Sequence, residues 1–279
     1  MKRWYKWILI SILLVAVYLI WSAWPRPFQL TFFDVGQGDA ALIQTKAGQT
    51  ILIDGGPDRK ILQKLGKSLP WDKRTIDVVI LSHPHADHLS GLIEVLKRYQ
   101  VQQILTTGVL HTTPEYLAFL QLIKDKHIPI QTVQAGQVFN LAGDVKIDIL
   151  WPNFSLVGQR FEDLNTTSIV NKVTFGKTTV LFMGDSPIDS EHALLQAGLD
   201  VRAQILKVGH HGSRNSSSEE FVKDVSPQMA IISVGEGNSF GHPHSDVVNK
   251  LTGLVPKVFR TDKDGDVNFV SDGDKWIGK

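Results

Sequence analysis

Two stretches of the chain repeat one plan, and this repetition limits the folds open to it. In each stretch, two strand-like runs form a hairpin whose second strand ends in an Asp, and a helix-like run then leads to a strand that ends in His. The residues are Asp54 and His83 in the first stretch and Asp185 and His211 in the second, 29 and 26 residues apart. Strand ends carry loops that expose chemistry on a rigid scaffold, so we expect both pairs to meet at one sheet edge.

The histidines are grouped, and each group follows a strand-like run. Seven of the ten fall in three groups: His83, His85 and His88; His210 and His211; His242 and His244. The first group, with Asp87, places three imidazoles and a carboxylate within six residues. Imidazole binds zinc and other transition metals well, and a carboxylate can bind a second ion. His83 and His85, two apart on an extended segment, point to one side, and Asp87 and His88 point to another. This geometry predicts two metal ions a few Å apart.

Residues 1–27 have the composition of a membrane anchor. The 17 residues from Ile8 to Trp24 carry no charge, which is just long enough for a transmembrane helix, and they follow the cations Lys2, Arg3 and Lys6. The positive-inside rule then predicts a cytoplasmic N-terminus, a single span and residues 28–279 on the extracytoplasmic side. A cleaved signal peptide is the alternative, although Trp21-Ser22-Ala23-Trp24 is a poor cleavage site. A buried core helix is a second alternative.

Residues 28–279 are predicted to form one domain, since no linker-like tract interrupts them. Helix-like runs are expected at 61–69, 90–99, 114–126, 188–197, 218–225 and 246–254, among twelve strand-like runs that include 76–81 and 178–182. Removing Lys2, Arg3 and Lys6 from 29 basic residues leaves 26 against 28 acidic ones, a net charge of −2. A broad basic face for nucleic acid is therefore not expected. The absence of Cys excludes disulfides and thiolate chemistry.

The segment His83-x-His85-x-Asp87-His88 resembles the signature of the metallo-β-lactamase fold hydrolases, which are α/β proteins built as a four-layer αββα sandwich of two similar halves. Five further segments resemble the C-terminal hydrolase domain of ComEC-type competence (DNA-uptake) proteins, in the same order along residues 30–270: Phe33-Asp34-Val-Gly-Gln-Gly-Asp39-Ala, Leu52-Ile-Asp54-Gly-Gly, Met183-Gly-Asp185, Lys207-Val-Gly-His210-His211-Gly-Ser213 and Gly241-His242-Pro-His244. Those proteins carry a polytopic membrane channel, whereas here a single anchor is predicted.

The resemblance implies a role for each matched residue. It implies that His83 and His85 bind one metal ion, that Asp87 and His88 bind a second, and that Asp185 bridges the two. One of His210 and His211 would complete the second site; His211 is preferred because it precedes the Gly, and His210 would contact substrate or orient its neighbour. The lactamases supply another His to the first site, but the segment from Leu164 to Ser168 has none.

The remaining candidates are supporting and substrate-binding residues. Asp54, Asp34 and Asp39 would orient the ligands, with ordinary turn formation as the alternative for each. Asp87, His210 and His244 are the predicted catalytic residues, His244 as a phosphate contact or general acid, and His242 and Ser213 are predicted to bind substrate. A surface loop is the alternative for the two histidines, and helix capping is the alternative for Ser213 and for Ser216, Ser217 and Ser218.

The resemblance and the ligand types together predict a hydrolase. Two divalent ions, zinc or manganese, that share a water can lower its pKa to ~7. The competence subfamily favours a phosphodiesterase, and DNA is the predicted substrate of a membrane-anchored nuclease. A hydrolase of another ester, of phosphocholine type or a small molecule, is one alternative. A metal-bound, non-enzymatic module of an envelope assembly is the other, and the sequence does not identify a protein partner.

Overall fold

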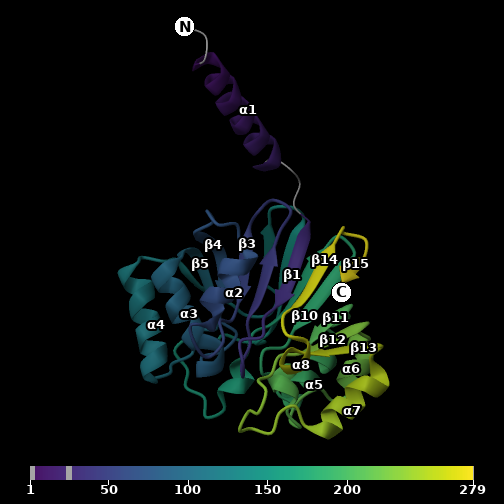
Figure 1. The fold of residues 1–279 in the computed structure, drawn as a ribbon. Coiled ribbons are helices and arrows are strands. Elements are labelled where there is room, and N and C mark those ends of the chain that lie inside the picture. Colours follow the sequence, from purple (N-terminus) through teal and green to yellow (C-terminus); the bar gives the residue numbers. More distant parts are fainter. Residues whose placement is uncertain (1–3, 23–26, 279) are drawn as a thin grey trace.

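The computed structural model describes residues 4–22 and 27–278; for residues 17–22 and 278 it describes the backbone alone. Helix α1 (Trp4–Ser22) lies apart from the rest of the chain (Figure 1). Among the described residues, we find no helix that is both long and apolar enough to cross a membrane. The span predicted from sequence ends at Trp24, and residues 23–26 lie outside the described residues. The anchor therefore stays a prediction.

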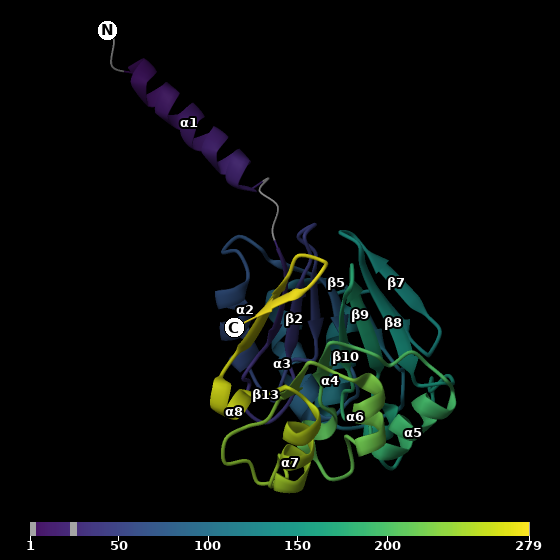
Figure 2. The same cartoon turned by 90° about the vertical axis from the view of Figure 1, so that its right-hand side faces the viewer.

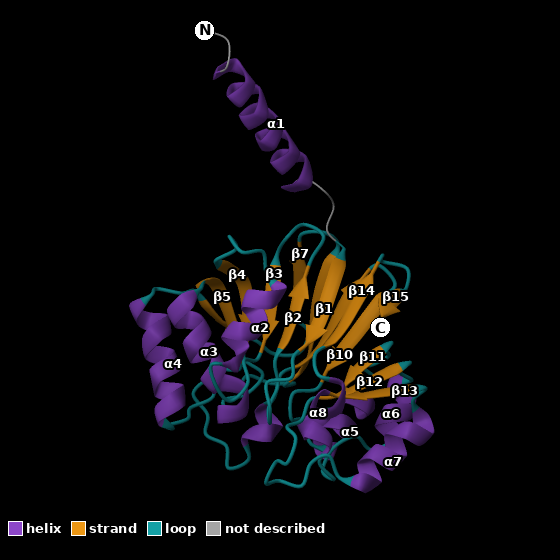
Figure 3. Ribbon diagram, in the orientation of Figure 1, coloured by secondary structure: helices purple, strands orange, loops and turns teal. Residues whose placement is uncertain are grey.

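Two mixed β-sheets form the centre of the domain (Figure 3). The first has eight strands in the order β15 (Trp276–Gly278), β14 (Val267–Ser271), β1 (Phe28–Phe32), β2 (Ala41–Gln44), β3 (Thr50–Ile53), β4 (Thr75–Ile80), β5 (Gln100–Thr106) and β6 (Ile130–Thr132). The second has seven in the order β13 (Lys257–Arg260), β12 (Met229–Ile232), β11 (Ile205–Lys207), β10 (Thr178–Phe182), β9 (Val170–Phe175), β8 (Val145–Trp151) and β7 (Val138–Leu141).

Helices pack against the outer face of each sheet. Against the first sheet pack α2 (Lys60–Ser68), α3 (Ala86–Arg98) and α4 (Pro114–Asp125), and against the second pack α5 (Ile188–Gln196), α6 (Glu219–Val225) and α7 (Ser245–Leu254). In Figure 2, α5, α6 and α7 lie in the lower part of the view and leave β7 and much of β8 uncovered. A short helix, α8 (Thr261–Asp264), follows β13. The layers are therefore helix, sheet, sheet, helix, as the sequence predicted.

Three hydrophobic clusters fill the spaces between these layers. Phe28, Phe32 and Phe182 belong to the cluster between the two sheets, where the rings of Phe32 and Phe182 lie 5.6 Å apart. Separate clusters lie under the helices of each sheet. All four residues of β3 are buried because one face meets the other sheet and the opposite face meets helices. A continuous apolar run is what such a two-sided strand requires.

The repeated plan of the sequence is confirmed by the strand pairing. β2 and β3 are antiparallel and β3 pairs in parallel with β4; β9 and β10 are antiparallel and β10 pairs in parallel with β11. Both halves thus turn from antiparallel to parallel pairing after an Asp. The helix predicted at 90–99 begins earlier, at Ala86, so Asp87 and His88 belong to its first turn. The sequence analysis did not predict β6, β7, β15 or α8.

Candidate metal centre

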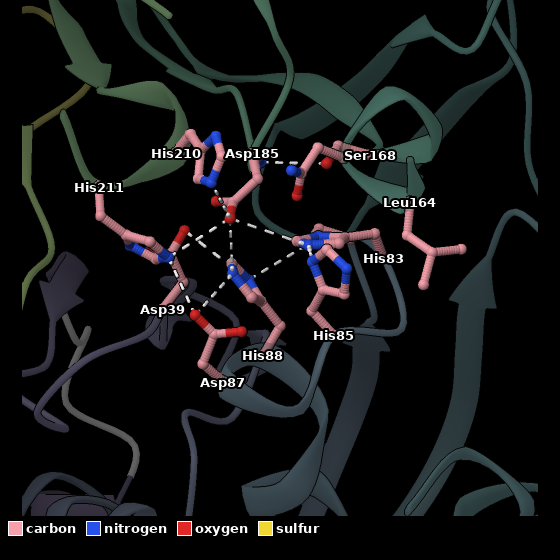
Figure 4. A network of polar contacts seen from close by, with 12 residues as sticks. Asp39, His83, His85, Asp87, His88, Leu164, Ser168, Asp185, His210 and His211 are labelled. Carbon is pink, nitrogen blue, oxygen red and sulfur yellow. Dashed lines mark hydrogen bonds and ion pairs between the residues drawn. The ribbon is translucent and has the colours of Figure 1, made fainter. Parts of the chain in front are cut away.

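Loops from both halves converge at one edge of the sandwich (Figure 4). The loop after β4 carries His83 and His85 and continues into α3, which carries Asp87 and His88. The loop after β10 carries Asp185, and a short 3₁₀ segment after β11, η2 (Gly209–Gly212), carries the histidine pair. Asp185 lies at the centre of the group, with imidazoles from both halves directed toward it (Figure 4). The predicted meeting of the two strand-end sets is therefore confirmed.

Four side chains form the larger of two ligand sets around Asp185. Its Oδ2 lies 3.4 Å from His88 Nε2 and 3.4 Å from His211 Nε2, and His211 Nε2 lies 3.2 Å from Asp87 Oδ2. One ligand atom from each of these four residues lies within 4.8 Å of the others. Four nitrogen and oxygen ligands are enough to complete a tetrahedral ion site.

The smaller set has three side chains and also uses Asp185. His83 Nε2 is 3.9 Å from Asp185 Oδ2 and 2.9 Å from His85 Nδ1. Among the described residues, no further His, Cys, Asp or Glu joins this set. The segment where the lactamases supply a ligand forms a 3₁₀ turn, η1 (Leu164–Thr167), and Ser168 Oγ then accepts a hydrogen bond from the Asp185 amide. One carboxylate therefore belongs to both sets.

Unpaired buried atoms indicate that these sets fit cations. His88 Nε2 and Asp185 Oδ1 are buried without a hydrogen-bond partner among the described residues, whereas buried polar atoms nearly always have one. The opposite nitrogens of two imidazoles are held in place: His88 Nδ1 lies 2.9 Å from Asp54 Oδ2, and His211 Nδ1 lies 2.9 Å from the Ser233 carbonyl oxygen. Such partners of the second ring nitrogen are typical of metal-binding histidines. The residues present therefore fit a pair of divalent ions.

A buried lysine neutralises the layer beneath these ligands. Asp39, Asp54 and His88 form a third close group, but Lys207 Nζ lies 2.6 Å from Asp39 Oδ2 and donates to the Val208 carbonyl. Both Lys207 and Asp39 are almost fully buried. Asp39 Oδ1 in turn lies 3.3 Å from His211 Nδ1. The third group therefore has its own cation, and Asp39 contacts a ligand as predicted.

Charge pairing shifts the pKa values of the buried groups in opposite directions. Burial alone would lower the pKa of His88 and His211, but the Asp185 carboxylate raises both well above the ordinary value. Burial opposes ionisation of Asp185, yet these two imidazoles hold its pKa well below the ordinary value. For His83, burial first and then the neighbouring His88 lower the pKa well below the ordinary value. These directions favour the protonated form of His88 and His211, whereas a metal ion binds only the neutral imidazole, so ion binding would release protons.

The histidine pair adopts an unusual backbone. His210 and His211 both have positive φ angles, 47° and 52°. Two consecutive non-glycine residues in this region are strained, and such strain is found at functional sites. The turn buries His211 against Asp185, whereas His210 Nε2 stays 3.9 Å from Asp185 Oδ2 and its side chain is partly exposed. His211 thus belongs to the larger candidate ligand set, and His210 lies at the wall of the centre.

The centre opens into a cavity of about 280 Å³. Its wall includes His85, Asp87, Asp185, His210, His211 and His242. His242 is the member of its pair that reaches the cavity, with its ring centroid 5.4 Å from that of His210. His244 lies behind it as the N-cap residue of α7, its ring 5.1 Å from His242. The sequence favoured His244 for catalysis; the geometry favours His242, because His242 lines the cavity and His244 does not.

Two groups of predicted residues lie outside the centre. The Asp34 carboxylate accepts from the Gly36 amide and pairs with Lys60 at 3.2 Å, and among the described residues no hydrogen bond or ion pair joins it to the ligands. The backbone amides of Ser217 and Ser218 donate to the buried Glu191 carboxylate, and Ser218 caps α6. Helix capping, the interpretation favoured from sequence, is thus confirmed for Ser218, and Glu191 occupies the two amides that a phosphate would need.

Ser213 likewise has a structural role: its Oγ accepts from the Asn215 amide, and its own amide donates to the His210 carbonyl. It is nearly buried and holds the turn that carries the histidine pair. A substrate-binding role for Ser213, as predicted, therefore finds no support in its contacts.

Three residues that position the candidate ligands or their partners were not predicted from sequence. Lys207 and Ser82 are the main ones, and Ser82 Oγ donates to Asp54 Oδ2 at 2.7 Å. Gly38 is a third: its φ is +134°, and a Cβ there would lie 2.1 Å from the Asp87 carbonyl oxygen. A signal for Lys207 was present, because it is a lone cation at the end of an apolar strand, two residues before the His-containing turn.

The family model of the metallo-beta-lactamase superfamily matches residues 33–236. The chain therefore belongs to the metallo-β-lactamase superfamily. Its sequence relatives include ComE operon protein 3 of Bacillus subtilis, 26% identical over 258 residues that cover 86% of this chain and 33% of that protein. Recombination protein 2 of Haemophilus influenzae is 30% identical over 272 residues that cover 94% of this chain and 31% of that protein. The chain thus spans about a third of the length of these curated relatives.

A solved structure shows the same fold. The metallo-beta-lactamase fold protein YhfI from Bacillus subtilis superposes with a TM-score of 0.58 and 17% sequence identity, covering 86% of this chain and 99% of that one. The competence-type resemblance of the sequence motifs and the lactamase-type architecture therefore agree.

Proposed function

We propose that the chain is a dinuclear metal-dependent hydrolase that cleaves phosphodiesters, with DNA as its substrate. One observation carries this proposal: two buried His/Asp sets share Asp185 and open into one cavity on a metallo-β-lactamase fold. Two divalent cations held there, zinc or manganese, would supply a nucleophile from water at neutral pH and neutralise charge on a reacting phosphate. The relative named Recombination protein 2 favours nucleic acid among the possible phosphodiesters.

The chain's own residues divide the remaining tasks. Asp54 and the Ser233 carbonyl fix the orientation of His88 and His211, and Lys207 holds Asp39 in place beneath them. At the cavity wall, burial first and then His210 lower the pKa of His242 to about 4. The His242 imidazole is therefore neutral at pH 7 and can hydrogen-bond a substrate oxygen or a leaving group without carrying a charge.

Cleavage of labelled single- and double-stranded oligonucleotides tests the proposal, with added zinc or manganese and with chelator. We expect chelator to abolish cleavage and His85→Ala to lower it about 100-fold or more, because even partners of metal ligands cost 10–100-fold. His111→Ala is the matched control, since His111 lies outside both ligand sets.

Two other results would favour one of the alternative functions over the proposed one. Turnover of phosphocholine esters or small esters, but not of oligonucleotides, would favour the other-ester hydrolase. No turnover of any substrate by the metal-loaded protein, together with DNA binding, would favour the non-enzymatic module.

We also propose that residues 1–27 anchor the domain at the cell membrane, with residues 28–279 on the extracytoplasmic side. The uncharged run between flanking cations and prolines in the sequence supports this placement. Fractionation of cells that express the full chain tests it: recovery in the soluble fraction would reject the anchor.

A further inference from the structure

An exposed aromatic ring stands at the mouth of the metal centre. Phe240 lines the same cavity as His242, His210 and Asp185, yet 64% of its surface is exposed. It lies in the loop between β12 and α7. Single exposed apolar residues are common on proteins, so exposure alone implies no role. The way in which the loop and the neighbouring rings hold Phe240 makes it different.

One amide side chain fixes the loop that presents this ring. Asn238 Nδ2 donates to the carbonyl oxygens of Gly235 and His242 at 2.9 and 2.6 Å. Asn238 Oδ1 accepts from the amides of Phe240 and His242, both at 3.1 Å. Four hydrogen bonds from one residue thus fix the backbone on both sides of Phe240, so the ring is held in place at the cavity.

The ring continues a row of ring contacts that leads to the ligands. Phe240 stacks on His242 with a centroid distance of 6.0 Å and an interplanar angle of 23°. His242 then lies 6.4 Å from His211, which belongs to the larger ligand set. A planar group that enters the cavity can therefore meet the Phe240 ring on the same wall that carries Asp185 and His211.

The cations near the cavity are not free to bind the phosphates of a nucleic acid, so an aromatic contact would have to contribute to substrate binding. The chain has 29 basic and 28 acidic residues, and nearby cations are already paired: Lys207 with Asp39, and Arg214 with Asp246 at 2.9 Å. Proteins that bind single strands combine cationic grooves with aromatic platforms, and each stacked base contributes ~1–3 kcal/mol. Bases inside a duplex are already stacked and paired, so an aromatic platform selects unpaired ones.

We propose that Phe240 is a stacking platform for an unpaired nucleobase next to the reacting phosphodiester, and that it makes the centre selective for single-stranded nucleic acid. This inference rests on the proposed phosphodiesterase function and adds the substrate form. The ring acts through its face, so an aromatic replacement retains the effect and an aliphatic side chain of similar size does not.

The test compares Phe240→Ala, Phe240→Leu and Phe240→Trp on two oligonucleotides, one with all its bases and one with abasic residues around the cleavage position. We expect Phe240→Ala and Phe240→Leu to lower kcat/KM on the oligonucleotide with all its bases about 5- to 150-fold, the equivalent of ~1–3 kcal/mol. Activity on the abasic strand should change less than about twofold, and Trp should retain activity on both. Phe154→Ala is the matched control, because Phe154 is also exposed but does not line the cavity.

Binding of a strand that contains 2-aminopurine gives a second readout, since stacking quenches its fluorescence. Quenching by the wild-type protein that Phe240→Leu removes and Phe240→Trp keeps supports the inference. Equal kinetics and quenching for wild type and Phe240→Ala would overturn it, as would equal losses on the base-bearing and abasic strands. A wild-type protein that binds and quenches the strand without cutting it would reject the phosphodiesterase function alone; one that binds no oligonucleotide would reject both.

Discussion

Asp185 connects the two candidate ligand sets, whose members come from both halves of the chain. It faces His83 from one ligand set and His88 and His211 from the other, and it is 2% exposed. In the metal-free protein these imidazoles and carboxylates compensate one another, which is why the pKa shifts of the acids and of His88 and His211 oppose each other. A cation would replace the protons in the same positions.

The ion pair between Lys207 and Asp39 provides a prediction at the residue scale. Lys207→Met removes the lysine partner of the buried Asp39 carboxylate and leaves only imidazole contacts, so we expect the free energy of unfolding in chelator to fall by about 3–5 kcal/mol. Lys60→Met is the control, because the Lys60–Asp34 pair is partly exposed and should contribute less than about 1 kcal/mol. Urea denaturation of both variants measures the difference, and equal losses would contradict a special role for the buried pair.

The sequence predicted the ligand residues because their chemistry is local. The His83–His88 segment shows its ligand types within six residues, and the structure places all of them at one centre. Supporting residues act through a partner far along the chain: Glu191 reaches Ser217 and Ser218, and Lys207 reaches Asp39. The sequence around Glu191 or Lys207 does not indicate which distant residue each will contact. The sequence favoured His244 over His242, whereas His242 lines the cavity, because the placement of the two rings depends on where α7 begins.

At the scale of elements, helix α3 positions half of the larger ligand set by close packing. Gly91 in this helix faces the Gly55 carbonyl oxygen, and a Cβ at Gly91 would lie 1.8 Å from it. The helix can therefore approach the turn after β3 only because both residues lack side chains. This approach brings His88 Nδ1 to 2.9 Å from Asp54 Oδ2.

Gly91→Ala should therefore destabilise the protein although alanine favours helix. We expect the free energy of unfolding to fall by ~1–3 kcal/mol or more and metal affinity to fall with it, because α3 must move away with Asp87 and His88. Gly66→Ala in α2 is the matched control: a Cβ there has open space, so it should stabilise by up to about 1 kcal/mol. Thermal unfolding and metal titration of the two variants measure these effects. Equal stability and equal metal affinity of Gly91→Ala and Gly66→Ala would contradict the proposed role of the close packing.

Elements with a buried face were predicted well, and exposed edge elements were not. The hairpins β2–β3 and β9–β10 carry strong apolar runs. β6 is fully exposed and β7 is half exposed, so neither has the apolar pattern that identifies a strand. These strands form because a neighbouring strand supplies hydrogen-bond partners, which local sequence does not reveal.

For the whole molecule, the repeated hairpin–helix–strand plan explains why one site can draw on both halves. Each half turns from antiparallel to parallel pairing at an Asp, and the two sheets pack face to face over one apolar core. The metal centre at their common edge is therefore a product of the entire fold. Its central claim is that Asp185 belongs to two ion sites at once.

Native mass spectrometry of the metal-loaded full chain, with zinc and separately with manganese, tests this claim most directly. We expect two divalent ions on the wild-type protein, two on Asp34→Asn, whose carboxylate lies outside the ligand sets, and fewer than two on Asp185→Asn. A wild-type protein that takes up no ion, or an Asp185→Asn variant that keeps both, would contradict it.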